Sequence, residues 1–192
     1  MVRARTIFHE FLKAPNKVGA VVPSSRYLAT AMLDQLNWDT LKNVVEYGPG
    51  TGAISKYLLQ RVGNHQNLFA VELNESFIPV LNDRLPELQV FNESVGDIRQ
   101  ICDRQGIDWV DGIISGLPWT AFPESLQEEL LSATLRVLAK GGQFITFAYL
   151  HGLPLQNARR FRSRLKETFS KVTISPVVWR NIPPAIFYSC RK

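Results

Sequence analysis

A glycine-rich stretch, residues 44–52, carries the residue types that most directly suggest chemistry. A short β-branched run leads into Gly48, Gly50 and Gly52, and helix-forming residues follow. Glycine lets the backbone approach a ligand closely and adopt positive φ, and free N–H groups at the start of a helix favour a polar or anionic ligand. The sequence therefore predicts a small-molecule cradle, formed by Glu46, Gly48, Gly50, Thr51 and Gly52.

A second carboxylate is placed to serve the same ligand. Residues 67–72 are expected to form a strand that ends in Glu72, one strand–helix unit after the glycine turn. Nucleotide-binding sheets hold the ribose at this point, and a carboxylate can accept hydrogen bonds from both ribose hydroxyls. We therefore expect Glu72 and the adjacent Leu73 to contact the ligand. An ordinary tight turn would explain the glycines alone, but not their combination with Glu46 and Glu72.

These residues can act together only if the fold brings them to the same edge of a sheet. Strand-like segments alternate with helical ones, which predicts an α/β fold with a doubly wound, mostly parallel sheet. The expected strands are 43–47, 67–72, 88–91, 110–115, 143–149, 171–175 and 185–190. The expected helices are 25–37, 52–62, 75–85, 97–104, 123–139 and 155–169. Ligands lie beyond the carboxyl ends of such strands, so one pocket should collect Gly48, Glu72, Gly96, Asp97 and Ser115.

The connection between the last two expected strands is of a different kind. It contains Pro176, Pro183 and Pro184 and shows no helical pattern. A hairpin-like connection is the natural alternative, because proline interrupts a helix. The final strand is therefore expected to run antiparallel to its neighbours.

Composition and charge narrow the class of protein. The chain has 192 residues, of which 45% are hydrophobic, as in one globular domain. A net charge of +5 weakly favours anionic partners. Cys102 and Cys190 show no metal-binding spacing and no disulfide framework, so we expect no metal site and a reducing cytoplasmic location. No stretch approaches the roughly 20 apolar residues that span a bilayer, and residues at the start of the sequence show no apolar core of a signal peptide, so we expect no secretion.

Residues 1–23 form a basic and apolar lead-in to a domain expected at 24–192. Apolar side chains fall on one helical face with basic residues beside them: Ile7, Phe8, Phe11 and Leu12, flanked by Arg3, Arg5, Lys13 and Lys17. A basic amphipathic helix of this type binds the membrane interface, aided by anionic lipids. The alternative is a lid packed on its own domain, with a solvated basic face.

Four segments together carry a family resemblance over nearly the whole chain. The glycine turn with Glu46 resembles motif I of methyltransferases that depend on S-adenosylmethionine (SAM). The segments 11–25, 115–119 (Ser-Gly-Leu-Pro-Trp) and 180–185 (Arg-Asn-Ile-Pro-Pro-Ala) resemble the bacterial phospholipid N-methyltransferases, which methylate phosphatidylethanolamine. That family is similar to the ribosomal RNA adenine dimethyltransferases. The resemblance implies a Rossmann-like class I fold, with a seven-stranded, mostly parallel sheet and an antiparallel last strand.

The resemblance also implies the cofactor and its contacts. SAM would be the methyl donor and S-adenosylhomocysteine the product, held by the glycine turn, Glu72, Leu73 and Ser115. Gly96 and Asp97 take the place of the acidic position that hydrogen-bonds the adenine amino group. The alternative for Asp97 is a helix N-cap, which aspartate serves well.

The substrate side follows from the segment after the fourth strand. It replaces the Asn-Leu-Pro-Tyr type motif of amine-methylating relatives, with Ser115 and Trp119 as departures. Its carbonyl groups would orient the amine, and Trp119 either contacts the methylated cation through its ring or packs beside Pro118. The implied substrate-binding residues are Gly116, Leu117, Pro118, Trp119 and Arg180, the last for the lipid phosphate or as a surface charge.

The attacking amine must first lose a proton. Tyr27 and His151 are the candidate bases, and with Ser115 they are the predicted catalytic residues. Histidine suits this task because it titrates near neutrality. Water is the alternative base, since a loop histidine and a core tyrosine are common without any catalytic role.

The predicted function is N-methylation of phosphatidylethanolamine toward mono-, di- and up to trimethylated products. The expected location is cytoplasmic, at the inner leaflet of the cytoplasmic membrane, without nucleic acid or metal. The alternatives are an RNA adenine dimethyltransferase-like enzyme, a methyltransferase for small amines, and a SAM-fold protein without turnover. The basic excess is modest for a nucleic-acid enzyme, which favours the lipid.

Overall fold

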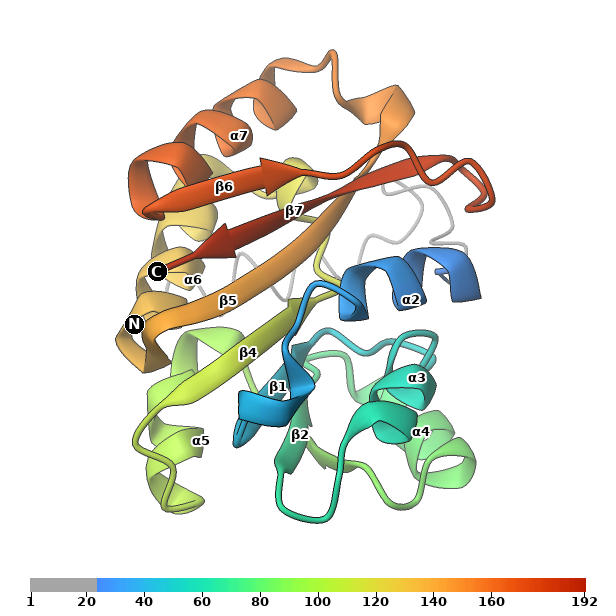
Figure 1. The fold of residues 1–192 in the computed structure, drawn as a ribbon, viewed down its shortest axis with the longest axis vertical. Helices are drawn as coiled ribbons and strands as arrows, with labels where there is room; N and C mark the ends of the chain where they lie inside the picture. Colours follow the sequence, from blue (N-terminus) through green and yellow to red (C-terminus); the bar gives the residue numbers. More distant parts are fainter. Residues whose placement is uncertain (1–23) are drawn as a thin grey trace.

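The computed structural model describes residues 24–192, and the predictions made for 1–23 lie outside the described residues. Seven strands form one sheet in the order β3-β2-β1-β4-β5-β7-β6 (Figure 1). The strands are β1 (Asn43–Tyr47), β2 (Asn67–Val71), β3 (Gln89–Phe91), β4 (Val110–Ser115), β5 (Leu138–Tyr149), β6 (Lys171–Ile174) and β7 (Ala185–Arg191). The strands β1 to β5 pair in parallel, whereas β7 runs antiparallel to both β5 and β6. The predicted sheet, including its antiparallel last strand, is confirmed.

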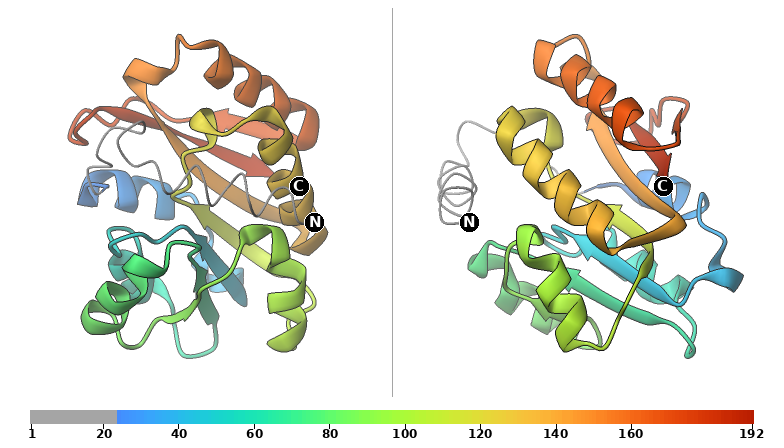
Figure 2. Two further views of the ribbon diagram at one scale, coloured as in Figure 1. Left: turned by 180° about the vertical axis from the view of Figure 1, so that it is seen from behind. Right: turned by 90° about the vertical axis from the view of Figure 1, so that its left-hand side faces the viewer.

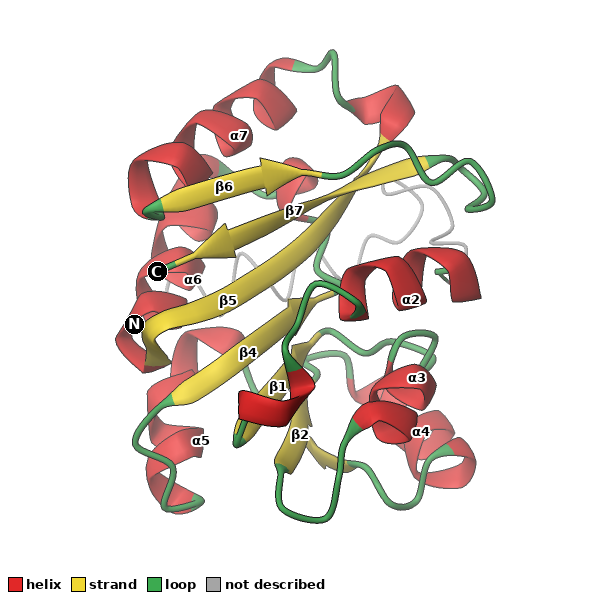
Figure 3. Cartoon of the chain, viewed as in Figure 1, coloured by secondary structure: helices red, strands yellow, loops and turns green. Residues whose placement is uncertain are grey.

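Helices cover both faces of the sheet (Figures 2 and 3). They are α2 (Arg26–Leu33), α3 (Ser55–Arg61), α4 (Ile78–Arg84), α5 (Ile98–Arg104), α6 (Glu124–Val137) and α7 (Gln156–Thr168). One buried apolar cluster joins the sheet to α5, α6 and α7, and a second joins the other face to α2 and α3. No helix in the described part of the chain is long and apolar enough to cross a membrane.

The first two expected helices are shorter in the structure, for local reasons; the third, 75–85, is α-helical only over α4, after a 3-10 turn at Glu75–Phe77. The expected helix 25–37 ends at Leu33, whose carbonyl accepts a hydrogen bond from the Trp38 indole at 3.0 Å. The expected helix 52–62 begins only at Ser55, because Gly52 has a φ of +83° and continues the turn. The second difference lengthens the glycine turn, and so leaves more backbone at the carboxyl edge of the sheet.

Candidate functional site

Hydrogen bonds between backbone segments join the carboxyl ends of the central strands into one site. Gly48 N–H donates to the Val71 carbonyl at 2.9 Å, which holds the glycine turn against the end of β2. Gly116 N–H donates to the Tyr47 carbonyl at 2.8 Å, which holds the segment after β4 against the end of β1. The glycine turn therefore lies between Glu72 on one side and segment 115–119 on the other, as the sequence predicted.

The glycine turn needs its glycines. Gly48, Gly50 and Gly52 have φ values of +66°, +56° and +83°, a region that L side chains rarely adopt. A Cβ on Gly48 would stand 2.7 Å from the Leu117 side chain, whereas a Cβ on Gly50 would meet no atom within 4 Å. The backbone at Gly50 is thus open to a ligand, while its neighbours are tightly packed. Thr51 stands partly exposed in the same turn.

Glu46 is a buried carboxylate with an unusual environment. Its side chain is 1% exposed, and neither carboxylate oxygen has a hydrogen-bond partner among residues 24–192. Burial raises the pKa of Glu46 to about 8; the Ser55 hydroxyl acts in the opposite direction, and the like charge of Glu72 adds a smaller rise. A buried carboxylate without partners is costly to ionise, so this group is ready to receive a cationic or hydrogen-bonding ligand.

Glu72 is held in place by two backbone amides. Its Oε2 accepts a hydrogen bond from Gly50 N–H at 3.0 Å, and its Oε1 accepts one from Asn74 N–H at 2.8 Å. Burial raises the pKa of Glu72, and these amides oppose the rise. A carboxylate has about four acceptor positions, so both oxygens can still accept from a ribose. The bond to Gly50 also couples the two halves of the predicted cradle.

Asn92 is a residue of this site that the sequence analysis missed. Its Nδ2 donates to the carbonyls of Glu72 and Leu73 at 2.8 and 3.2 Å, and so fixes the chain just after β2. It follows β3 directly, as the other site residues follow their strands. A polar residue at the end of β3 was the signal available.

Gly96 and Asp97 lie in a short 3-10 helix before α5, at the same edge of the sheet. Ser94 caps this turn, since its Oγ accepts from Gly96 N–H at 3.1 Å. Asp97 occupies the N-cap position of α5 but makes no capping hydrogen bond with its side chain. The N-cap alternative therefore holds for its position and not for its side chain, and the adenine contact stays a prediction.

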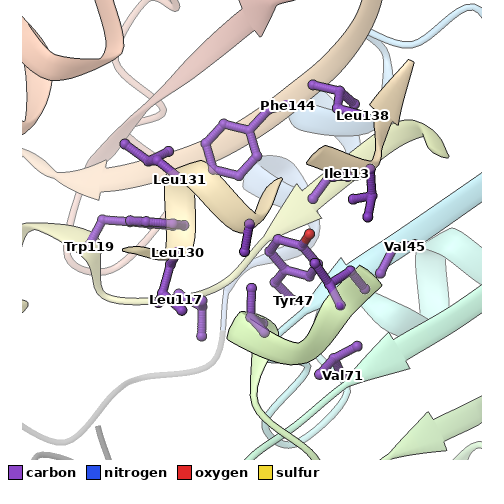
Figure 4. Packing of buried hydrophobic residues seen from close by; sticks show 14 of the residues in the cluster. Val45, Tyr47, Val71, Ile113, Leu117, Trp119, Leu130, Leu131, Leu138 and Phe144 are labelled. Atoms are coloured by element: carbon purple, nitrogen blue, oxygen red, sulfur yellow. The ribbon is translucent and has the colours of Figure 1, made fainter. Parts of the chain in front are cut away.

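The segment after β4 turns two of the predicted site residues inward. Ser115 is fully buried, and its Oγ accepts a hydrogen bond from Trp119 Nε1 at 2.8 Å. The Trp119 ring is 1% exposed and stacks on Phe161 with ring centroids 5.4 Å apart. Figure 4 shows Trp119 within the same packed cluster as Leu117 and Phe144.

These contacts give the Ser115 and Trp119 side chains partners inside the core, and their predicted roles toward a ligand stay predictions. The structure gives Trp119 the packing role that the sequence left open beside the cation–π role. The Ser115 hydroxyl serves the indole, because a buried N–H needs an acceptor. The backbone carbonyls of 115–118 remain the groups that this segment can offer to an amine.

The two candidate bases lie in different surroundings. The Tyr27 hydroxyl accepts a hydrogen bond from Arg26 at 2.7 Å, and the Arg26 and Arg180 guanidinium groups stand 4.7 and 4.9 Å from the ring centroid. The hydrogen bond from Arg26, with the positive charges of both arginines, lowers the pKa of Tyr27. His151 is exposed after β5, and its ring stacks on Tyr149 at 5.8 Å. Arg26 was not among the predicted residues.

The geometry defines a class of protein before any comparison. A sheet in this order, with a glycine turn after β1 and a carboxylate after β2, is a class I SAM-dependent methyltransferase fold. Residues 44–142 match the methyltransferase domain family. The O-methyltransferase TomG from Streptomyces achromogenes, solved in complex with SAM, aligns with a TM-score of 0.67 at 18% identity, over 100% of this chain and 89% of that one. An N1-methyltransferase from Burkholderia thailandensis with bound S-adenosylhomocysteine gives 0.67 at 14% identity, over 96% and 86%.

Curated sequences narrow the class. The ornithine lipid N-methyltransferase of Singulisphaera acidiphila is 31% identical over 185 residues, which are 95% of this chain and 92% of that protein. The ribosomal RNA small subunit methyltransferase A of Sulfurihydrogenibium sp. is 32% identical over 73 residues, 38% of this chain and 28% of that protein. The chain therefore belongs to the methyltransferase domain family and, within it, to a bacterial lipid N-methyltransferase family.

SAM, the cofactor of this fold, suits the residues of the site. Its sulfonium and ammonium groups are cationic, and the buried Glu46 carboxyl group would be a partner for such a charge once it ionises. The open backbone at Gly50 admits a close ligand, and Glu72 keeps acceptor capacity for the ribose. The specific contacts of each residue stay predictions.

Proposed function

We propose that this enzyme methylates the amine of a membrane-lipid head group, with phosphatidylethanolamine as its substrate. The supporting observation is the likeness, over 95% of the chain, to an ornithine lipid N-methyltransferase. Phosphoethanolamine and ornithine both carry a primary amine beside an anionic group. Both substrates therefore need the same two features in the enzyme, namely a binding position for the amine and a cationic group for the anion.

Residues at the carboxyl edge of the sheet offer both of these features. Guanidinium groups match the geometry of phosphate and carboxylate oxygens, and those of the exposed Arg26 and Arg180 lie 4.7 and 4.9 Å from the centre of the Tyr27 ring. Among residues 24–192, no ion pair joins either arginine to a carboxylate. Their charge is therefore available to an anionic head group.

Methyl transfer requires the protein mainly to align the amine with the methyl group and to remove a proton from the amine. SAM supplies an electrophilic methyl group on a sulfonium. The carbonyls of segment 115–118 orient the amine, since positioning supplies much of the rate of such a displacement. Tyr27 is the proposed base: its phenolate form would take the proton from the ammonium group, and the hydrogen bond from Arg26 with the positive charges of both arginines lowers the pKa of that phenol.

Radiolabelled methyl transfer from SAM tests the proposal. Vesicles that contain phosphatidylethanolamine, vesicles that contain ornithine lipid, and unmodified ribosomal RNA are offered in parallel, and the lipids are resolved by chromatography. We expect label in methylated phosphatidylethanolamine. Label in ornithine lipid alone would mean that the enzyme methylates a lipid amine, but on the ornithine head group and not on phosphatidylethanolamine. Label in RNA alone would contradict the lipid proposal, and the 73-residue likeness to an RNA methyltransferase makes that arm necessary.

Membrane association of the segment 1–23, at the inner leaflet of the cytoplasmic membrane, belongs to the same proposal. Deletion of residues 1–12 should weaken cosedimentation with anionic vesicles while the domain 24–192 stays folded. Unchanged cosedimentation of the truncated protein would show that the membrane contact lies elsewhere on the enzyme.

A further inference from the structure

Two large apolar side chains are displayed on the loop between β6 and β7. Trp179 is 70% exposed and Ile182 is 75% exposed, and Arg180 stands between them in the sequence. Single exposed apolar residues are common on protein surfaces. An exposed tryptophan and isoleucine on one short loop, beside exposed arginines, are a less ordinary combination.

The loop is held in this conformation by a buried polar residue. Asn181 is 1% exposed; its Oδ1 accepts from Ser25 N–H at 2.8 Å, and its Nδ2 donates to the Pro183 carbonyl at 2.7 Å. Val178 N–H donates to the Ala185 carbonyl at 2.8 Å and closes the base of the loop. The residues on either side of Asn181 are therefore displayed by a fixed framework.

The topology places this loop at the edge that carries the site. Because β7 is antiparallel to both β5 and β6, β6 runs in the direction of the parallel strands, and the segment that follows it lies at their carboxyl edge. Figure 1 shows this connection at the same side of the molecule as α2. The Arg180 guanidinium lies 4.9 Å from the centre of the Tyr27 ring on α2.

The charges beside the loop indicate what covers it. Arg180 and Arg26 are exposed, and the described residues form no ion pair with either. By contrast, Arg160 and Arg164 on α7 pair with carboxylates of α6. Tryptophan prefers the bilayer interface, and basic residues next to it are attracted to anionic lipids. An anionic bilayer satisfies the apolar and the charged side chains together.

We propose that the β6–β7 loop, residues 178–184, is a membrane-contact element of this enzyme. Trp179 and Ile182 enter the interfacial layer of the bilayer, and Arg180 and Arg26 face lipid phosphates. The contact is additional to any made by residues 1–23. Its purpose rests on the proposed function, since it would bring the carboxyl edge of the sheet to the head groups.

Cosedimentation of the full chain with vesicles of phosphatidylethanolamine and phosphatidylglycerol tests the contact. The double variant Trp179→Ala/Ile182→Ala should bind about tenfold more weakly or worse, because it loses both apolar side chains. Trp109→Ala is the matched control: Trp109 is 55% exposed, but it precedes β4 at the opposite edge of the sheet. It should bind within about twofold of the unaltered chain. Thermal unfolding of each variant checks that the fold is intact.

Fluorescence quenching gives a second measurement that does not depend on a loss of binding. Vesicles with brominated acyl chains should quench the Trp109→Phe protein, which keeps Trp179, and should quench Trp179→Phe much less. Equal quenching of the two, or equal binding of the double variant and the unaltered chain, would overturn the membrane contact. The same holds if the unaltered chain does not bind vesicles.

Activity then separates this inference from the proposed function. With short-chain phosphatidylethanolamine dispersed as monomers, the double variant should methylate within about threefold of the unaltered chain, whereas its rate on vesicles should fall about tenfold. Equal loss on both substrates would contradict a membrane role for the loop. Loop-dependent vesicle binding without methylation of any lipid would overturn the proposed function and leave the contact standing.

Discussion

The two sides of the candidate site differ in whether backbone or side-chain groups form them. On the side of β1 and β2, the glycine turn presents mainly backbone, and Glu72 is tied to that backbone through Gly50 N–H and Asn74 N–H. On the side of α2 and the β6–β7 loop, side chains dominate, namely the exposed Arg26 and Arg180 and the partly buried Tyr27.

This difference explains which property each side can share with distant relatives. Solved methyltransferases at 14–18% identity align with TM-scores near 0.67, so the fold that carries this backbone is shared at low sequence identity. We therefore expect the first side to hold the cofactor and the exposed side chains of the second side to select the head group.

Gly116→Ala should have the largest effect, because Gly116 follows β4, the strand between the two sides, and its N–H is bonded to the end of β1. A Cβ there would stand 2.7 Å from the Gly48 carbonyl oxygen, a backbone atom that cannot swing away. We expect methyl transfer to fall about 100-fold, as a displacement of about 1 Å can cause, and stability to fall by about 1–3 kcal/mol. Gly152→Ala is the control, since its Cβ would meet no atom within 4 Å. Equal activity of the two variants would mean that the two sides are not coupled at this contact.

Glu72→Ala should weaken the binding of SAM by about 30-fold or more. The change removes two acceptor oxygens and leaves Gly50 N–H without its partner, and hydrogen bonds to charged groups contribute about 1.5–3 kcal/mol each. Titration calorimetry measures the affinity. Glu75→Ala, an exposed carboxylate three residues further on, should leave it unchanged. If SAM bound Glu72→Ala as tightly as the unaltered chain, the ribose role would be refuted.

The residues of the first side, and their positions at the ends of β1 and β2, could be predicted from the sequence. Most side-chain contacts of the second side could not. Strands β1 and β2 are apolar runs that end in a glycine turn and a carboxylate, so local pattern and topology were sufficient to place Gly48 and Glu72. The contact of Arg180 with Tyr27 joins residues 153 positions apart, and no local pattern announces it. The Ser115–Trp119 hydrogen bond was equally hidden, because a serine and an indole at that spacing could both have faced solvent.

Glu46 tests whether the first side is electrostatically prepared for a cation. The pKa of Glu46 is raised from an ordinary 4.5 to about 8, so between these values the folded chain holds a proton that the unfolded chain releases. Stability contributed by this group is present below the lower value and is lost as pH rises, by up to about 1.4 kcal/mol per pH unit. In Glu46→Gln that loss should vanish. Chemical denaturation of both proteins from pH 5 to about pH 8 measures the difference, and parallel curves would contradict the raised pKa.

Bound SAM should act on the same proton. Its positive charges favour ionised Glu46, so binding near neutral pH should release a proton and the affinity should rise with pH. Calorimetry in buffers of different ionisation enthalpy counts that proton. In Glu46→Gln the proton release should disappear, whereas an unchanged count would place the released proton on another group.

Ser115→Ala should have the smallest effect on activity, and it separates a structural role from a chemical role at the end of β4, the strand between the two sides. The variant leaves Trp119 Nε1 buried without an acceptor, which should cost about 1–3 kcal/mol of stability. Because the hydroxyl is fully buried and already accepts the indole, methyl transfer should change less than about threefold at a temperature where the variant is folded. Adding Trp119→Phe should recover part of the stability, since both hydrogen-bonding groups are then gone. A large loss of activity in the stable double variant would support the catalytic role that the sequence predicted for Ser115, and would show that side chains as well as backbone set the geometry where the two sides meet.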